Sequence, residues 1–181
     1  IAYDPFTGEE IWRIVRGEDS TIASPCYEDG SVFFHTGFVT DTDNNRFAEL
    51  IAVNPDGCGD IESTNILWRN QVPILQLLTP VIKEGLIYLI DTKNMLMCLR
   101  ADTGQTIWSR RMRGKYNSSP VFAGGHLYFS STAGETTVIK PGTSLDIVAE
   151  NMLEGEIWTT PAVVEGGIII RTSEYLYRIG E

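Results

Sequence analysis

Four copies of a short pattern recur along the chain: a Ser or Thr, then a proline, then a glycine five residues after that proline. The four pairs are Pro25/Gly30, Pro80/Gly85, Pro120/Gly125 and Pro161/Gly166. Successive prolines stand 55, 40 and 41 residues apart, and each glycine precedes a run rich in β-branched and aromatic residues. A period near 40 residues, made of short strands and turns, is typical of β-propeller blades. The pattern therefore predicts an all-β chain of repeated four-stranded antiparallel blades.

Residues 79–112 show the repeat most clearly, as four strand-forming runs separated by glycine-containing or polar turns. The unit at 24–72 has the same order with two insertions, TDTDNNR and PDGCGDIEST, which account for its longer spacing. We expect the following division of the chain: closing strands at 1–16, blades at 20–72, 76–112 and 116–152, and a partial blade at 157–181.

The two ends of the chain look complementary. Residues 1–16 supply the end of a third strand and a fourth strand, whereas 157–181 supplies three strands and no fourth. Propellers remove exposed sheet edges by pairing such ends. Either two copies of the chain complete an eight-bladed ring, or one chain closes a four-bladed ring. We also expect the chain to be the C-terminal part of a longer exported protein.

Composition excludes several classes of protein. Twenty-four acidic against 14 basic residues give a net charge of −10, which would repel nucleic acid. No apolar run approaches the ~20 residues that cross a bilayer as a helix. The three cysteines cannot all pair, and none has the spacing of a zinc ligand. We expect Cys26 and Cys98 to be buried thiols and Cys58 to be exposed.

A second motif, A-x-D-x-x-T-G-x-x-x-W, is complete at 2–12, partial at 98–108 and degenerate at 52–68. The unit at 116–152 lacks the tryptophan, and Val148 is predicted to occupy its position. The motif resembles the tryptophan-docking repeat of the pyrroloquinoline quinone (PQQ)-type β-propellers, a family usually built of eight blades. The resemblance covers almost the whole chain, and it implies that the motif tryptophans bridge neighbouring blades.

The resemblance implies two functional classes. Quinoprotein dehydrogenases of this type hold PQQ and Ca²⁺ and use an adjacent Cys-Cys pair, which this chain lacks. Non-catalytic members include the lipoprotein subunit of the outer-membrane β-barrel assembly machinery. We expect a non-catalytic binding or scaffold propeller without catalytic residues, cofactor or metal, located in the periplasm or outside the cell. The alternative is the C-terminal part of a PQQ/Ca-dependent quinoprotein dehydrogenase.

Two further groups of residues are candidate sites. The spacing of Asp41, Asp43 and Asn45 matches the first ligand positions of a calcium-binding loop, but the glycine and the terminal glutamate of such a loop are missing. We therefore expect a polar hairpin insertion. His35 and His126 each stand alone on a strand, without a serine or carboxylate partner at a defensible spacing. We expect both histidines to serve packing rather than catalysis.

The connections that enter the innermost strands converge at one mouth of a propeller channel, so this face is the predicted interaction surface. Trp158 stands out because it lies three residues before Pro161 and outside the docking motif. The partner is expected to be a protein or a glycan. The candidate residues are Asp19, Ser20, Gln76, Lys115, Tyr116, Asn117 and Trp158.

Overall fold

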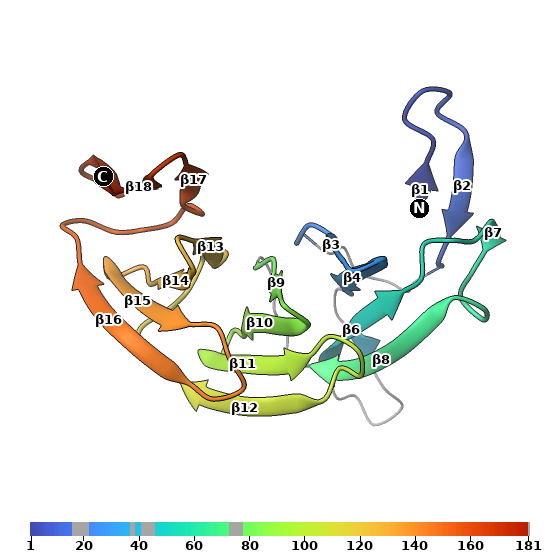
Figure 1. Cartoon of the computed structure of the whole chain (residues 1–181), viewed down its shortest axis with the longest axis horizontal. Helices are drawn as coiled ribbons and strands as arrows, with labels where there is room; N and C mark the ends of the chain where they lie inside the picture. The colour runs from blue at the N-terminus through green and yellow to red at the C-terminus, as the bar shows by residue number, and fades with distance from the viewer. Residues whose placement is uncertain (16–21, 37–38, 41–45, 73–77, 181) are drawn as a thin grey trace.

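The computed structural model describes residues 1–15, 22–36, 39–40, 46–72 and 78–180. These ranges contain β-strands and no helix, and the strands form sheets arranged along an open arc, with antiparallel pairing throughout except between β2 (Glu10–Arg13) and β7 (Gly59–Asp60) (Figure 1). The all-β propeller architecture predicted from the repeat is therefore confirmed. A helix long and apolar enough to cross a membrane is not found in the described ranges.

Four of the sheets follow one another as blades. The first blade contains β3 (Cys26–Glu28), β4 (Ser31–His35), β6 (Arg46–Val53) and β8 (Ile66–Val72), with β5 (Val39–Thr40) beside β6. The second contains β9 (Val81–Lys83), β10 (Leu86–Ile90), β11 (Met95–Arg100) and β12 (Thr106–Arg111). The third contains β13 (Val121–Ala123), β14 (His126–Ser130), β15 (Glu135–Lys140) and β16 (Asp146–Met152). The fourth contains β17 (Ala162–Val164), β18 (Gly167–Arg171) and β19 (Leu176–Gly180).

A fifth, smaller sheet lies at the N-terminal end of the arc and consists of β1 (Ala2–Tyr3), β2 (Glu10–Arg13) and β7 (Gly59–Asp60). Strands β3, β9, β13 and β17 line the concave side of the arc, and β8, β12 and β16 lie on its convex side (Figure 1). The small sheet and the fourth blade stand at opposite ends of the arc (Figure 1).

The glycine of each Pro/Gly pair closes the first hairpin of its blade. Its φ is positive in all four copies, at 75° in Gly30, 73° in Gly85, 80° in Gly125 and 70° in Gly166. Two-residue hairpin loops require this conformation, and glycine adopts it without steric cost. This requirement explains why the glycine recurs at one offset from the proline.

The hydroxyl residue before each proline links neighbouring blades. The amide of Ser24 donates to the hydroxyl of Thr79 at 3.0 Å, and the amide of Thr79 donates to Ser119 at 2.9 Å. The amide of Ser119 donates in turn to the hydroxyl of Thr160 at 3.1 Å. These bonds form a ladder along the inner strands, which we call the hydroxyl ladder. The recurrence of Ser or Thr before proline is visible in the sequence, but its hydrogen bond to the neighbouring blade was not predicted.

Apolar side chains fill the space between consecutive blades. One buried cluster joins the first and second blades and includes Phe33, Leu50 and Leu89. A second cluster joins the second and third blades and includes Tyr88 and Leu96. The facing sides of consecutive blades thus cover each other, as expected when strands have few polar positions on either face.

Two motif tryptophans connect one blade to the next. The indole of Trp68 donates to the carbonyl of Ala101 at 2.8 Å, and that of Trp108 donates to the carbonyl of Gly142 at 3.2 Å. Both acceptors lie in the turn between the third and fourth strands of the following blade. Trp12 packs on the opposite face of the first blade, beside Ile51 and Ile61.

The position assigned to Val148 in the sequence is wrong by one residue. Trp68 pairs with Ala52, and Trp108 pairs with Cys98, in each case next to a shift of register. In the third blade the residue paired at this place is Ala149, opposite Val138, and Val148 falls in the bulge. The segment from Val138 to Ala149 is one residue longer than that from Cys98 to Trp108, so counting along the sequence missed the shift.

The second insertion has a structural role that the sequence did not reveal. Its strand β7 pairs in parallel with β2, with Trp12 opposite Gly59 and Arg13 opposite Asp60. Ile61, which follows β7, is 1% exposed and packs beside Trp12. The insertion therefore fastens the N-terminal sheet to the first blade.

Candidate functional site

Strand direction separates two faces of the arc. The connections between blades enter β3, β9, β13 and β17 from one face, which we call the connection face. The first hairpin turns and the turns between third and fourth strands lie at the other ends of the same antiparallel strands, on what we call the turn face.

Of the predicted site residues, Asp19, Ser20 and Gln76 lie outside the described residues, as do Asp41, Asp43 and Asn45.

The connection before the third blade contains three predicted residues in different environments. Lys115 is exposed, Asn117 is half-buried and Tyr116 is 8% exposed within the core between the second and third blades. Burial raises the pKa of Tyr116 to about 12. The backbone carbonyl of Lys115 accepts a hydrogen bond of 2.8 Å from the amide of Thr132. Tyr116 therefore anchors the connection and does not present its ring on the surface.

Trp158 is an exposed aromatic residue of the connection face, on which Tyr175 in the turn between β18 and β19 is also exposed. The Trp158 side chain is 56% exposed, and its indole donates to a carboxylate oxygen of Glu156 at 2.8 Å. A shallow pocket of about 130 Å³ adjoins it and is bounded by Arg171 and Ser173. Glu156 and Arg171 were missed in the sequence. Arg171 could have been noticed, because it ends an otherwise apolar strand.

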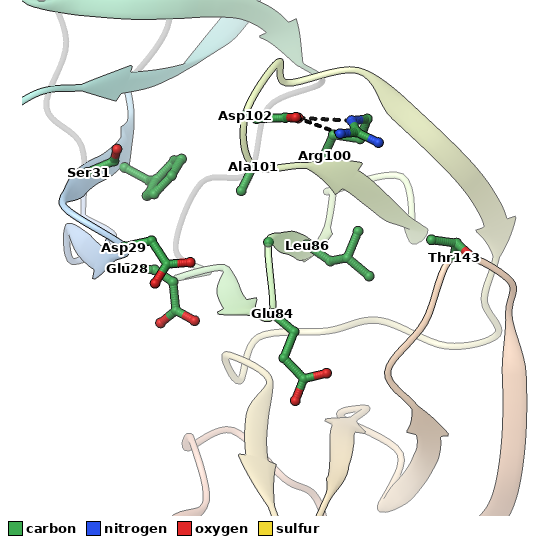
Figure 2. A pocket seen from close by; sticks show the side chains of 11 residues that line it. Glu28, Asp29, Ser31, Glu84, Leu86, Arg100, Ala101, Asp102 and Thr143 are labelled. Atoms are coloured by element: carbon green, nitrogen blue, oxygen red, sulfur yellow. Dashed lines mark hydrogen bonds and ion pairs between the residues drawn. The ribbon is translucent and has the colours of Figure 1, made fainter.

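A larger pocket of about 440 Å³ opens on the turn face between the first and second blades (Figure 2). Its lining includes Glu28, Asp29 and Glu84 above an apolar floor that contains Phe33 and Leu86. Carboxylates of this kind make the pocket electronegative. None of these residues was predicted as part of a site.

Arg100 and Asp102 stand at the edge of the same pocket and are joined by two hydrogen bonds (Figure 2). The two nitrogen–oxygen distances are 2.9 and 2.5 Å. The hydrogen bonds from Arg100 lower the pKa of Asp102. This pair partly neutralises the pocket wall, and both side chains are exposed to solvent.

The histidines and cysteines do not assemble into a reactive group in the described part of the chain. Nδ1 of His35 lies 2.9 Å from the carbonyl oxygen of Thr36, and burial lowers the pKa of this histidine. Burial also raises the pKa of the Cys98 thiol to about 11, whereas Cys58 is exposed as predicted. Among the described residues, no group of three or more His, Cys, Asp or Glu side chains could hold a metal ion.

Comparison with known proteins agrees with the repeat architecture. A family model described as outer membrane protein assembly factor BamB matches residues 57–148, just over half of the chain. A BamB of Marinobacter adhaerens is 26% identical over 101 residues, covering 55% of this chain and 25% of the relative. A BamB of Yersinia pestis is 20% identical over 177 residues, covering 87% of this chain and 44% of the relative. The chain thus spans less than half the length of these curated relatives.

Solved structures share the fold at low sequence identity. The crystal structure of BamB from Moraxella catarrhalis aligns with a TM-score of 0.63 at 11% identity, over 86% of this chain and 41% of that one. The computationally designed protein Ika4 aligns at 0.65 and 11% identity, over 96% of this chain and 100% of Ika4. The designed protein Ika8 aligns at 0.66 and 10% identity, over 98% of this chain and 51% of Ika8. Because the BamB family model matches half of its length, the chain belongs to this family of PQQ-like repeat proteins.

Proposed function

We propose that this chain is a non-catalytic scaffold propeller that binds a protein partner in outer membrane protein assembly, through its connection face and on the periplasmic side. Membership of the BamB family supports the functional class. The exposed ring of Trp158 is the single observation that supports the connection face as the binding surface.

Trp158 is not required by the repeat. It lies three residues before Pro161, and the residue three before Pro120 in the preceding unit is Asn117, which is half-buried. A tryptophan at this place leaves a large apolar surface in water, although its N–H is already bonded to Glu156. Aromatic side chains of this type carry much of the binding energy at protein interfaces. Arg171 and Glu156 would form the charged rim around such an anchor.

The quinoprotein alternative demands chemistry for which this chain gives no support. The 181-residue sequence has no adjacent cysteine pair, and the acidic residues of the larger pocket lie on turns of the turn face. The scaffold proposal predicts no stoichiometric binding of PQQ with Ca²⁺. Calorimetric titration of the chain with PQQ and Ca²⁺ measures this directly, and one-to-one binding would favour the dehydrogenase.

A site-specific photo-crosslink tests the binding surface. A photoreactive phenylalanine analogue replaces Trp158 in the chain expressed in its own host, and the adducts are identified by mass spectrometry. We expect an adduct with a component of the outer-membrane assembly apparatus. The same analogue at Leu67 is the matched control, because Leu67 is 55% exposed but lies in β8 on the convex side. Equal adducts from both positions, or no assembly component from position 158, would overturn the proposal.

A further inference from the structure

We propose that the second blade docks on an anionic lipid surface through a cluster of exposed cations at its outer corner on the connection face. The inference goes beyond the proposed protein partner and depends on a different blade and a different measurement, so either proposal can fail alone. We call the cluster the basic corner, and its residues are Lys93, Arg110, Arg111, Arg113 and Lys115.

Two segments of the second blade bring these cations together. Lys93 lies in the turn between β10 and β11, and the other four lie at the end of β12 and in the connection that follows it. Arg111 pairs with Met95, which lies two residues after Lys93. The amide of Met112 donates to the carbonyl of Asn94 at 2.8 Å. The end of β12 is therefore held against the turn that carries Lys93.

The connection after β12 is also fixed against the third blade. The amide of Thr132 donates to the carbonyl of Lys115 at 2.8 Å. Gly114 has a φ of 84°, and a Cβ added there would lie 3.3 Å from the Cβ of Ser131. The backbone therefore approaches the third blade closely at this point. Because it is held on both sides, it presents Arg113 and Lys115 at a defined place on the connection face.

The basic corner is not neutralised by the described part of the protein. All five of its side chains are exposed, and none of them forms an ion pair within the described residues. The chain has 24 acidic and 14 basic residues, so carboxylates are in excess. Unpaired cations that stand side by side repel one another, and a bound external anion relieves this repulsion. The ion pairs of the described residues use other cations, namely Arg13, Arg69, Lys83 and Arg100.

The third blade has the same corner with a different charge. Its β16 pairs with β15 as β12 pairs with β11, and the amide of Leu153 donates to the carbonyl of Gly134 at 3.0 Å, in the same place as the Met112 bond. This corner has two carboxylates and no cation at the corresponding positions. The packing of the fold therefore does not require the positive charge of the basic corner. The residues at these positions are Ala133, Asn151, Met152, Glu154 and Glu156.

The surface around the basic corner favours lipid headgroups over a protein segment. Between residues 78 and 146, no large apolar side chain is exposed. A protein interface has a buried core depleted in charge and enriched in aromatic residues, and the corner offers no such core. An anionic bilayer attracts clusters of about four to eight Lys and Arg by charge alone. Arginine also binds phosphate groups through two parallel hydrogen bonds. Anionic phospholipid headgroups thus match the basic corner in charge and in chemistry.

The net charge of −10 does not prevent this contact. At physiological ionic strength the Debye length is about 8 Å, so carboxylates farther than this from the headgroups are largely screened. The cations that touch the bilayer then determine the interaction, and each contributes about fivefold to the binding constant. Binding of this kind is sensitive to salt and to the position of each charge.

Sedimentation with lipid vesicles tests the proposal on the 181-residue chain. One set of vesicles contains equal parts of phosphatidylglycerol and phosphatidylcholine, and the other contains phosphatidylcholine alone. We expect binding to the anionic vesicles only, and we expect it to be lost at about 0.5 M salt, where the Debye length is below about 5 Å. Equal binding to both kinds of vesicle, or binding to neither, would overturn the proposal.

A triple variant tests the location of the contact. Lys93→Ala, Arg110→Asn and Arg111→Met together give the second blade the residues of the third blade at these positions. The variant should bind anionic vesicles about a hundredfold more weakly, at about fivefold per charge, with an unchanged circular dichroism spectrum.

The matched control for this variant combines Arg13→Gln, Arg69→Gln and Lys140→Gln, which remove the same net charge outside the basic corner. This control should lower vesicle binding by less than about fivefold, because its charges lie away from the contact. Equal losses in the two triple variants would show that the net charge governs binding and would overturn the proposal.

Two further measurements separate the basic corner from other binding surfaces. Trp158→Ala should bind anionic vesicles like the parent, because Trp158 lies in the connection that enters the fourth blade. Loss of vesicle binding in this variant would contradict the location on the second blade. Soluble poly-glutamate should bind the chain more weakly than anionic vesicles do. Equal or tighter binding of poly-glutamate would assign the basic corner to an acidic protein segment and overturn the proposal.

Discussion

The second blade and the fourth blade have the same strand pattern but opposite surroundings. The face of β10 and β11 that carries Tyr88 and Leu96 is sealed by the third blade, whereas the corresponding face of β18 and β19 is open to solvent. The open face carries Ile169 and Leu176, but Arg171 and Arg178 stand on it where the second blade has the core residues Ile90 and Cys98. Both the residues on a face and the blade packed against it therefore decide whether that face becomes a core. Burial of one large aliphatic side chain contributes about 1.5–3 kcal/mol, so the second blade gains stability that the fourth blade lacks within the described residues.

The largest difference is expected between Leu96→Ala and Leu176→Ala. Leu96 is fully buried, and its truncation should lower the free energy of unfolding by about 2–5 kcal/mol through lost burial and a cavity. Leu176 is 72% exposed, so its truncation should change this free energy by less than about 0.5 kcal/mol. Urea unfolding of the two variants measures both losses. Equal losses would show that this face of the fourth blade is covered in solution.

A smaller difference is expected between Gly104→Ala and Gly8→Ala. Both glycines occupy the Thr-Gly turn with φ near 70°, so each substitution incurs the same backbone strain of about 1 kcal/mol. At Gly104 the added Cβ would lie 2.7 Å from the Trp68 ring, which adds about 1–3 kcal/mol of overpacking. At Gly8 no atom lies within 4 Å. In thermal or urea unfolding, Gly104→Ala should be clearly less stable than Gly8→Ala. The opposite order would contradict the close contact between position 104 and the Trp68 ring.

The smallest difference concerns the hydroxyl ladder. Ser119→Ala removes the acceptor for the Thr79 amide and should lower the free energy of unfolding by about 1 kcal/mol. Ser24→Ala removes a hydroxyl that receives no amide in the described residues, so it should be nearly neutral. Urea unfolding of the two variants measures the difference. An equal loss in Ser24→Ala would show that the Ser24 hydroxyl also accepts a stabilising hydrogen bond.

Much of the fold could be predicted because the repeat encodes local requirements. The positive φ of Gly30 or Gly85 follows from a two-residue hairpin loop, and the alternation of strands and turns follows from local composition. The exposure of Cys58 and the burial of Cys98 were predicted for the same reason, whereas Cys26, which was also expected to be buried, is only partly buried. A pattern that depends on a residue and its near neighbours is readable without knowledge of the rest of the molecule.

The candidate site was less predictable, because exposure depends on distant segments. Tyr116 and Trp158 both lie in connections that enter inner strands, yet Tyr116 is buried between the second and third blades and Trp158 is exposed. The acidic pocket on the turn face joins Glu28 to Glu84 and Asp102, which no sequence motif links. Position along the chain could place these residues on a face of the arc but could not say which of them solvent reaches.

The sequence by itself determined that the chain forms repeated four-stranded antiparallel sheets, because strand periodicity, turn glycines and blade spacing are local properties. The tertiary structure alone decided three other features. Ala149 pairs opposite Val138, where the first and second blades have a tryptophan. The second insertion pairs with β2, and the Ser or Thr before each proline joins one blade to the next. These features arise from hydrogen bonds and register shifts between residues 11 to 55 positions apart. Such contacts exist only once the blades are packed together.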